Sequence, residues 1–223
     1  STPQIRHANA LRLDWNEVLP AQRCGYVLGN PPFRGKQNQT PKQKADVAPI
    51  FQALEGGVVL DLVAAWYVKS ADYAKLNRTL NIGFLSTNSI VQGEQVGVLW
   101  GWMMAQGIKI NFAHRSFKWS NEASSNAAVH CIVVGFSYVN STFKTIYEYA
   151  VANGQPLAVT AKNINAYLVD ALDVVLPSRR TSICNVPPIV FGSMANDGGH
   201  FFLNDQEKIE LLNVCPEAAP WIR

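Results

Sequence analysis

The stretch of this chain best suited to chemistry is Asn30-Pro31-Pro32-Phe33, which follows Gly29 and the apolar residues 24–28. Each X-Pro bond holds the preceding residue in extended geometry, and proline has no N–H to donate, so the stretch can neither continue a helix nor pair fully in a sheet. We expect a stiff turn at the end of a strand. It would hold two hydrogen-bond acceptors, the Asn30 side chain and the Pro31 carbonyl, beside the Phe33 ring. That arrangement suits a planar base with an exocyclic amino group; the alternative is a stiff strand exit without chemistry.

Charged residues lie on both sides of this motif. Asp14 follows a short apolar stretch and precedes a polar turn, as an acid at the tip of a strand would. The alternative is a helix N-cap, which is favoured when Asp14 is taken alone. After the motif, a polar loop at residues 34–45 contains four cations and no acid: Arg34, Lys36, Lys42 and Lys44. Such a loop is either a solvated face or, beside a base pocket, a phosphate-contacting loop.

Composition and spacing exclude several classes of protein. The four cysteines lie far apart without CxxC spacing, which argues against a zinc ribbon and favours an intracellular protein over a disulfide-stapled one. His114 and His130 lack metal-ligand spacing, so we interpret them as structural and expect no metal. The 223 residues are 48% hydrophobic and 16% charged with a net charge of +3, which permits nucleic-acid binding without indicating it. We find no signal peptide or bilayer-spanning run and expect a cytoplasmic protein.

The expected elements position the motif at one edge of a sheet. Their order is strand, helix, strand, helix, strand, strand, at residues 26–28, 57–75, 80–85, about 94–106, 108–113 and 128–136. This alternation predicts an α/β fold with a mostly parallel sheet, whose last strand, joined without a helix, runs antiparallel. Ligands gather at the carboxyl ends of such strands. The motif, residues 86–88 and the loop at 115–126 should therefore meet there.

The composition of the chain changes beyond residue 137, where prolines and glycines become frequent. We expect a strand at 143–149, a linker or short helix at 163–168, a hairpin turn at 197–199, and a helix that a capping box at 204–207 opens. This predicts three parts: a first domain at 1–140, a connecting segment at 141–174, and the beginning of a second, mixed α+β domain at 175–223.

Several collinear motifs together resemble a known family. The Asn-Pro-Pro-Phe turn is similar to motif IV of amino-methyltransferases that use S-adenosylmethionine. Seven further segments point to one family within these enzymes: residues 84–90, 92–95, 112–117, 119–123, 127–130, 163–168 and 191–193. With them the chain resembles the MmeI-like DNA adenine methyltransferases of restriction–modification systems, which have a Rossmann-like sheet. On this resemblance residues 1–140 are the C-terminal part of a methyltransferase catalytic domain, and residues 175–223 begin a DNA target-recognition domain.

The resemblance implies methylation of the N6 amino group of an adenine flipped out of double-stranded DNA. Asn30 and Pro31 would accept the two N6 protons, Pro32 would stiffen the turn, and Phe33 would stack on the base. Three further roles are carried over from the family: Asp14 and Gly29 would contact the cofactor S-adenosylmethionine, and the loop with Phe117 and Trp119 would pack a second aromatic ring on the flipped base. The basic loop after the motif supplies Arg34 and Lys36 as candidate DNA contacts. No metal and no membrane take part.

The sequence lacks two parts that members of the family carry. The family's glycine-rich cofactor motif should precede residue 1, and the nuclease domain that its members carry upstream is also missing from this sequence. We therefore expect a fragment of a larger polypeptide, which alone binds S-adenosylmethionine weakly or not at all and is inactive. Two other functions stay open: an N-methyltransferase acting on RNA or on protein glutamine, and a non-catalytic DNA-binding specificity module.

Overall fold

The computed structural model describes residues 3–119, 129–151, 154–179, 181–187, 198–199 and 202–222. The chain divides into two compact units, Ser1–Ser178 and Arg179–Arg223. The described part of the second unit contains α6 (Asp205–Val214) and a 3₁₀ turn (Pro216–Trp221). Reciprocal hydrogen bonds between Asn204 and Glu207 open α6, so the predicted capping box is confirmed. The predicted hairpin turn at 197–199 lies partly outside the described residues.

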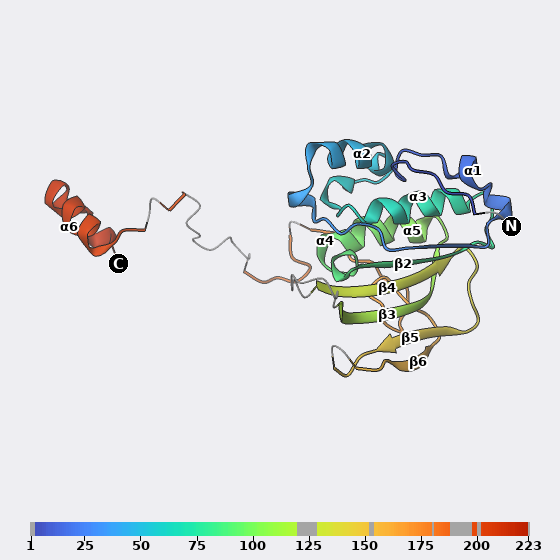
Figure 1. Cartoon of the computed structure of the whole chain (residues 1–223). Helices are drawn as coiled ribbons and strands as arrows, with labels where there is room; N and C mark the ends of the chain where they lie inside the picture. Colours follow the sequence, from blue (N-terminus) through green and yellow to red (C-terminus); the bar gives the residue numbers. More distant parts are fainter. Residues whose placement is uncertain are drawn as a thin grey trace. The chain divides into compact units, whose positions relative to one another are not determined.

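In the described part of the first unit, six strands form one sheet with the order β1-β2-β4-β3-β5-β6 (Figure 1). Their bounds are β1 (Tyr26–Gly29), β2 (Asn81–Thr87), β3 (Lys109–Trp119), β4 (Val129–Ser137), β5 (Lys144–Glu148) and β6 (Leu157–Ala161). The last two come from the expected connecting segment and belong to the same sheet. β6 was not predicted from the sequence.

Strand direction follows from the pairings. β1 and β2 are parallel, as are β3 and β5, whereas β4 is antiparallel to both β2 and β3, and β6 is antiparallel to β5. Four strands thus run one way and two run the other. The α/β class, the mostly parallel sheet and the reversed direction of the strand after residue 128 are confirmed.

The helices gather near the β1–β2 side of the sheet, and β5 and β6 form its other edge (Figure 1). They are α1 (Trp15–Val18), α2 (Pro41–Phe51), α3 (Ala64–Ala74) and a continuous helix at residues 93–105, made of α4 (Gly93–Gln95), a π-helical turn (Val96–Trp100) and α5 (Gly101–Ala105). Among the described residues no helix is both long and apolar enough to cross a membrane.

The core joins these helices to the sheet through an aromatic cluster centred on Tyr67 of α3. Its ring stacks on Phe136 with centroids 5.2 Å apart, and it meets Phe84 and Trp100 edge-on at 5.3 and 5.8 Å. All four side chains are buried. The Tyr67 hydroxyl and the Ser86 hydroxyl are 2.7 Å apart, which satisfies both groups, and burial raises the pKa of Tyr67. The cluster fixes α3 over the carboxyl half of β2.

Two elements differ from the sequence prediction. The expected loop at 34–45 contains the start of α2, because Thr40 and Gln43 form a capping box and Pro41 occupies the first turn. The expected helix at 57–75 forms only from Ala64, since the Leu62 N–H donates to the carbonyl of Arg34 instead of to its own helix.

β3 also differs, because it extends into the expected loop at 115–126 through pairing with β4 as far as Trp119 and Val129. The rest of that expected loop, residues 120–126, lies outside the described residues.

Candidate active site

The motif continues β1 beyond the point where the strand ends. Gly29 is the last paired residue and lies opposite Phe84, so the following residues lie at the edge where β2 also ends. Pro31 is buried and Phe33 is half-buried against the core, whereas Asn30 is exposed. Among the described residues the Asn30 side chain has no hydrogen-bond partner. The turn is thus anchored through its rings and leaves the Asn30 amide free to bind a ligand.

Gly29 allows the strand to pass close to the core. A Cβ at this position would lie 3.3 Å from Cε1 of Phe84, which is closer than an ordinary carbon–carbon contact. Phe84 is itself held by the aromatic cluster around Tyr67. The glycine therefore sets how the motif leaves the sheet.

Asp61, which sequence reasoning missed, connects the loop after the motif to the end of β2. Its Oδ1 accepts from the Lys36 N–H at 2.9 Å and its Oδ2 from the Ser89 hydroxyl at 2.7 Å. The Asp61 N–H donates to Oε1 of Gln95 at 3.0 Å. The only sequence signal for this role is an acid placed inside the apolar run of residues 58–63.

This network lies at the edge of the sheet where β2 ends. The Ser89 hydroxyl is 2.7 Å from the hydroxyl of Thr87, the last residue of β2, so Asp61 joins residues 36, 87 and 89 at one edge. An open cavity of about 680 Å³ lies there. Its lining includes Gly35, Lys36, Asp61, Ser89, Glu94 and Gln95. As predicted, the end of β1, where the motif begins, lies beside the end of β2. Residues 30–33 do not line this cavity, and residues 120–126 of the third predicted segment lie outside the described residues.

Asp14 caps α1, as the sequence pattern favoured. Its Oδ1 accepts from the Asn16 backbone N–H at 2.9 Å and from the Asn16 side chain at 3.1 Å. These hydrogen bonds from Asn16 lower the pKa of Asp14, so the carboxylate is ionised at neutral pH. It lines a cavity of about 400 Å³ with Lys69 and Tyr73, whose walls do not include the motif. A role for Asp14 in cofactor binding stays a prediction.

The expected DNA-contacting residues lie in two places. The Arg34 and Lys36 side chains are exposed on the loop that Asp61 holds. Phe117 is half-buried on β3 and lies opposite Cys131, which also pairs with Thr87 of β2. Phe117 is therefore level with the end of β2, two strands away. Trp119 is the last residue of β3, and its side chain lies outside the described residues.

Phe117 belongs to an aromatic group that the sequence did not reveal. Its ring lies 5.2 Å from Tyr149, and Nδ1 of His114 is 2.8 Å from the Tyr149 hydroxyl. His114 also stacks on Tyr147 with centroids 4.2 Å apart. These contacts give His114 a structural role, and burial lowers its pKa. Among the described residues no three His, Cys, Asp or Glu side chains form a group that could hold a metal ion.

Comparison with known proteins identifies the family. The family model described as "MmeI, DNA-methyltransferase domain" matches residues 1–148, and "MmeI, target recognition domain" matches residues 170–223. DNA methyltransferase A of Bacillus subtilis (strain 168) is 39% identical over 221 residues, which cover 98% of this chain and 24% of that protein. The Type IIL restriction-modification enzyme MmeI, solved in complex with DNA, is 51% identical with a TM-score of 0.90, covering 98% of this chain and 29% of MmeI.

The chain thus spans about a quarter of the length of the curated relative. The two family models account for all but residues 149–169 of the chain. This chain belongs to the MmeI family of restriction–modification DNA methyltransferases, with a methyltransferase domain followed by target-recognition sequence.

Proposed function

We propose that the protein containing this chain transfers a methyl group from S-adenosylmethionine to the N6 amino group of an adenine extruded from double-stranded DNA. The observation that carries the proposal is the exposed Asn30 amide, which has no hydrogen-bond partner in the described part of the chain, on a turn anchored by buried Pro31 and half-buried Phe33. Membership of a DNA-methyltransferase family gives this turn its chemical context. A base inside a duplex is stacked and paired, so it must leave the helix to reach such a turn.

The turn supplies hydrogen-bond acceptors and positioning. Asn30 Oδ1 and the Pro31 carbonyl accept one N6 proton each, which draws the nitrogen lone pair away from conjugation with the ring. Phe33 supplies an aromatic edge or face for the base. As the bond between N6 and the methyl group forms, the bond between that methyl group and its sulfur donor breaks, and N6 loses one of these protons to solvent. Fixed positioning accounts for much of the rate enhancement in a displacement of this kind.

Two residues of the chain suit the cofactor. Asp14 is an ionised carboxylate whose Oδ2 has no hydrogen-bond partner among the described residues, so it can accept from an exocyclic amine. Gly29 is the last residue of β1, where the motif leaves the sheet, and in the family a residue in this place approaches the methionine part of the cofactor. When bound, S-adenosylmethionine supplies an electrophilic methyl group.

DNA is the proposed partner. The exposed cations Arg34 and Lys36 stand beside the motif and suit backbone phosphates, whose contacts position a duplex without reading its sequence. Phe117, with Trp119 beyond it on β3, comes from the neighbouring part of the same edge and is our candidate for a second aromatic contact to the base. The remainder of the protein would supply the rest of the cofactor site, the complete recognition domain and a nuclease.

Identifying the methylated atom tests the proposal. The intact protein is incubated with duplex DNA, RNA or protein in the presence of labelled S-adenosylmethionine, and the digested products are separated by mass spectrometry. We expect N6-methyladenine from duplex DNA alone. Label on cytosine, RNA or glutamine would contradict the adenine assignment, and no transfer to any acceptor would favour a non-catalytic specificity module.

A further inference from the structure

The junction between the two family domains is built into the first compact unit. The target-recognition match begins at residue 170, yet that unit continues to Ser178. Residues 170–178 therefore pack on the methyltransferase domain. Their contacts fall into two groups, one at each end of the segment at 173–178, which we name the strap.

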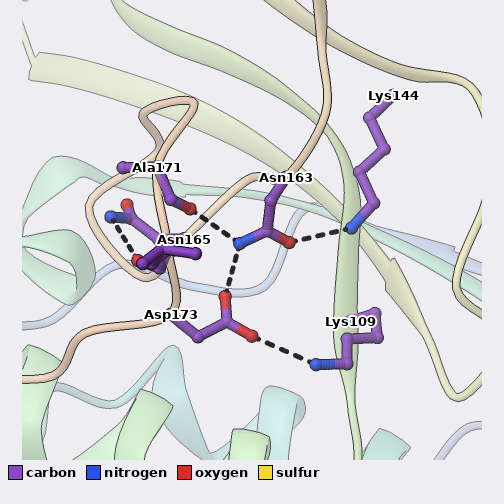
Figure 2. Close-up of polar contacts among 7 residues, drawn as sticks. Lys109, Lys144, Asn163, Asn165, Ala171 and Asp173 are labelled. Atoms are coloured by element: carbon purple, nitrogen blue, oxygen red, sulfur yellow. Dashed lines mark hydrogen bonds and ion pairs between the residues drawn. The ribbon is translucent and has the colours of Figure 1, made fainter.

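A polar clasp holds the start of the strap at the amino ends of two neighbouring strands (Figure 2). Asp173 Oδ2 accepts from Nζ of Lys109, the first residue of β3, at 3.1 Å. Asp173 Oδ1 accepts from Asn163 Nδ2 at 2.8 Å, and Oδ1 of Asn163 accepts from the buried Lys144, the first residue of β5, at 3.4 Å. Burial alone would raise the pKa of Asp173, but the hydrogen bonds from Asn163 and Lys109 outweigh it and lower that pKa.

From the clasp the strap runs back along the helix at residues 93–105. Gly101 lies against Val175: a Cβ on Gly101 would be 3.8 Å from Cγ1 of Val175. One turn nearer the helix start, a Cβ on Gly97 would be only 3.2 Å from the Leu176 carbonyl oxygen. The Ser178 hydroxyl then donates to Oε1 of Glu94 at 3.4 Å. The strap is thus antiparallel to the helix and crosses the unit from the amino ends of the strands to their carboxyl ends.

The far end of the strap lies beside the hydrogen-bond network that Asp61 forms with Lys36, Ser89 and Gln95. Glu94 lines the same cavity as Asp61 and Lys36, and its neighbour Gln95 accepts from the Asp61 N–H. We propose that the strap and its clasp are a positioning device for DNA methylation: they fix the point, beside the catalytic edge, from which the target-recognition domain starts. This proposal rests on the proposed function. Asp173, Asn163 and Gly97 are accordingly positioning residues, since they act through the recognition domain and touch no reacting atom.

The two helix glycines offer a matched test in the intact protein. Gly97→Leu places carbon atoms where the strap backbone lies. The substitution does not destabilise the helix itself, because leucine is a better helix former than glycine. Gly101→Ala replaces a glycine of the same helix with only ordinary contact to Val175 and serves as the control. Asp173→Ala breaks the strap independently at its other end.

Three measurements are made on each variant: the thermal unfolding midpoint, hydrogen exchange of residues 174–178, and the single-turnover rate of methyl transfer to bound duplex DNA. The Leu176 N–H donates to the Tyr167 hydroxyl, so exchange there reports release of the strap. We expect Gly97→Leu and Asp173→Ala to raise this exchange and slow methyl transfer roughly 10- to 100-fold, as misalignment of bound reactants does. Gly101→Ala should remain within about twofold of the unmodified protein, the range of neutral surface changes.

The methylation rates decide whether the strap positions the recognition domain for methyl transfer or only stabilises the fold. Faster exchange with unchanged methyl transfer in Gly97→Leu and Asp173→Ala would overturn the proposal, as would equal loss of rate in Gly101→Ala. An unmodified protein that methylates no DNA would overturn the proposed function and the strap's role with it, so the unmodified protein distinguishes the two failures.

Discussion

Asn30 and Pro31 are adjacent in the chain but differ in burial. The Pro31 ring is buried, whereas the Asn30 amide is exposed and has no hydrogen-bond partner among the described residues. A free amide on a fixed backbone can meet a substrate without first breaking a protein hydrogen bond. At the scale of single residues, the site therefore depends on what holds the turn as much as on the amide itself.

Gly29 is the first residue on which this geometry can be tested. We expect Gly29→Ala to lower the free energy of unfolding by about 1 kcal/mol, because the added Cβ presses on a Phe84 ring that the core already holds. Urea denaturation of the chain measures the change. Gly25→Ala, whose Cβ would meet nothing within 4 Å, is the control. Equal effects at both positions would show that the space beside Phe84 does not matter.

His114 predicts a pH dependence of stability. Burial lowers its pKa in the folded chain below the ordinary value of 6.5, so the unfolded chain binds more protons as the pH falls through that value. The free energy of unfolding should therefore decrease from pH 7 towards pH 5. His114→Gln should reduce this slope in denaturation curves recorded across the range. An unchanged slope would mean that His114 does not titrate differently in the two states.

At the scale of elements, the sequence predicted what depends on local patterns. The proline turn, most strands and α6 follow from covalent restriction, alternating burial and capping residues close together in the chain. Asp61 could not be predicted in this way, since its partners Lys36 and Ser89 lie 25 and 28 residues away and only the fold brings them together. The same holds for the strap, whose partners Lys109 and Glu94 are 64 and 84 residues distant.

α2 was missed although its signal is local. Thr40 accepts from the Gln43 N–H and Gln43 in turn accepts from the Thr40 N–H, but the surrounding cations made the segment resemble a loop. We expect Thr40→Ala to lower the free energy of unfolding by about 1 kcal/mol through loss of the cap. The exposed Lys42→Ala in the same turn is the control. Equal urea midpoints for the two variants would argue against the cap.

At the scale of the whole molecule, β1 is the strand that indicates how this chain fits into the intact protein. In the described residues it pairs only with β2, and its Tyr26 and Leu28 side chains are 72% and 76% exposed. An unpaired edge with large apolar side chains is a surface that proteins normally cover. Since the chain spans about a quarter of its curated relative, we propose that another part of the intact protein covers this edge and completes the cofactor site.

This proposal predicts how the cofactor binds. Isothermal titration of the 223-residue chain with S-adenosylmethionine should give no measurable binding heat, because on our proposal Asp14 and Gly29 supply only part of the contacts. The intact protein should bind the cofactor in the same buffer. Binding of similar strength by both would show that this chain already contains the complete site.

The most direct test of the central claim concerns Asn30 in the intact protein. Single-turnover methylation of duplex DNA is compared for Asn30→Ala and for Asn38→Ala, another exposed asparagine near the motif. We predict that Asn30→Ala slows transfer roughly 100- to 1,000-fold, as loss of one fixed polar group in an active site does. Asn38→Ala should transfer at the unmodified rate. Equal rates for the two variants would contradict the account, because Asn30 would then not hold the amine that is methylated.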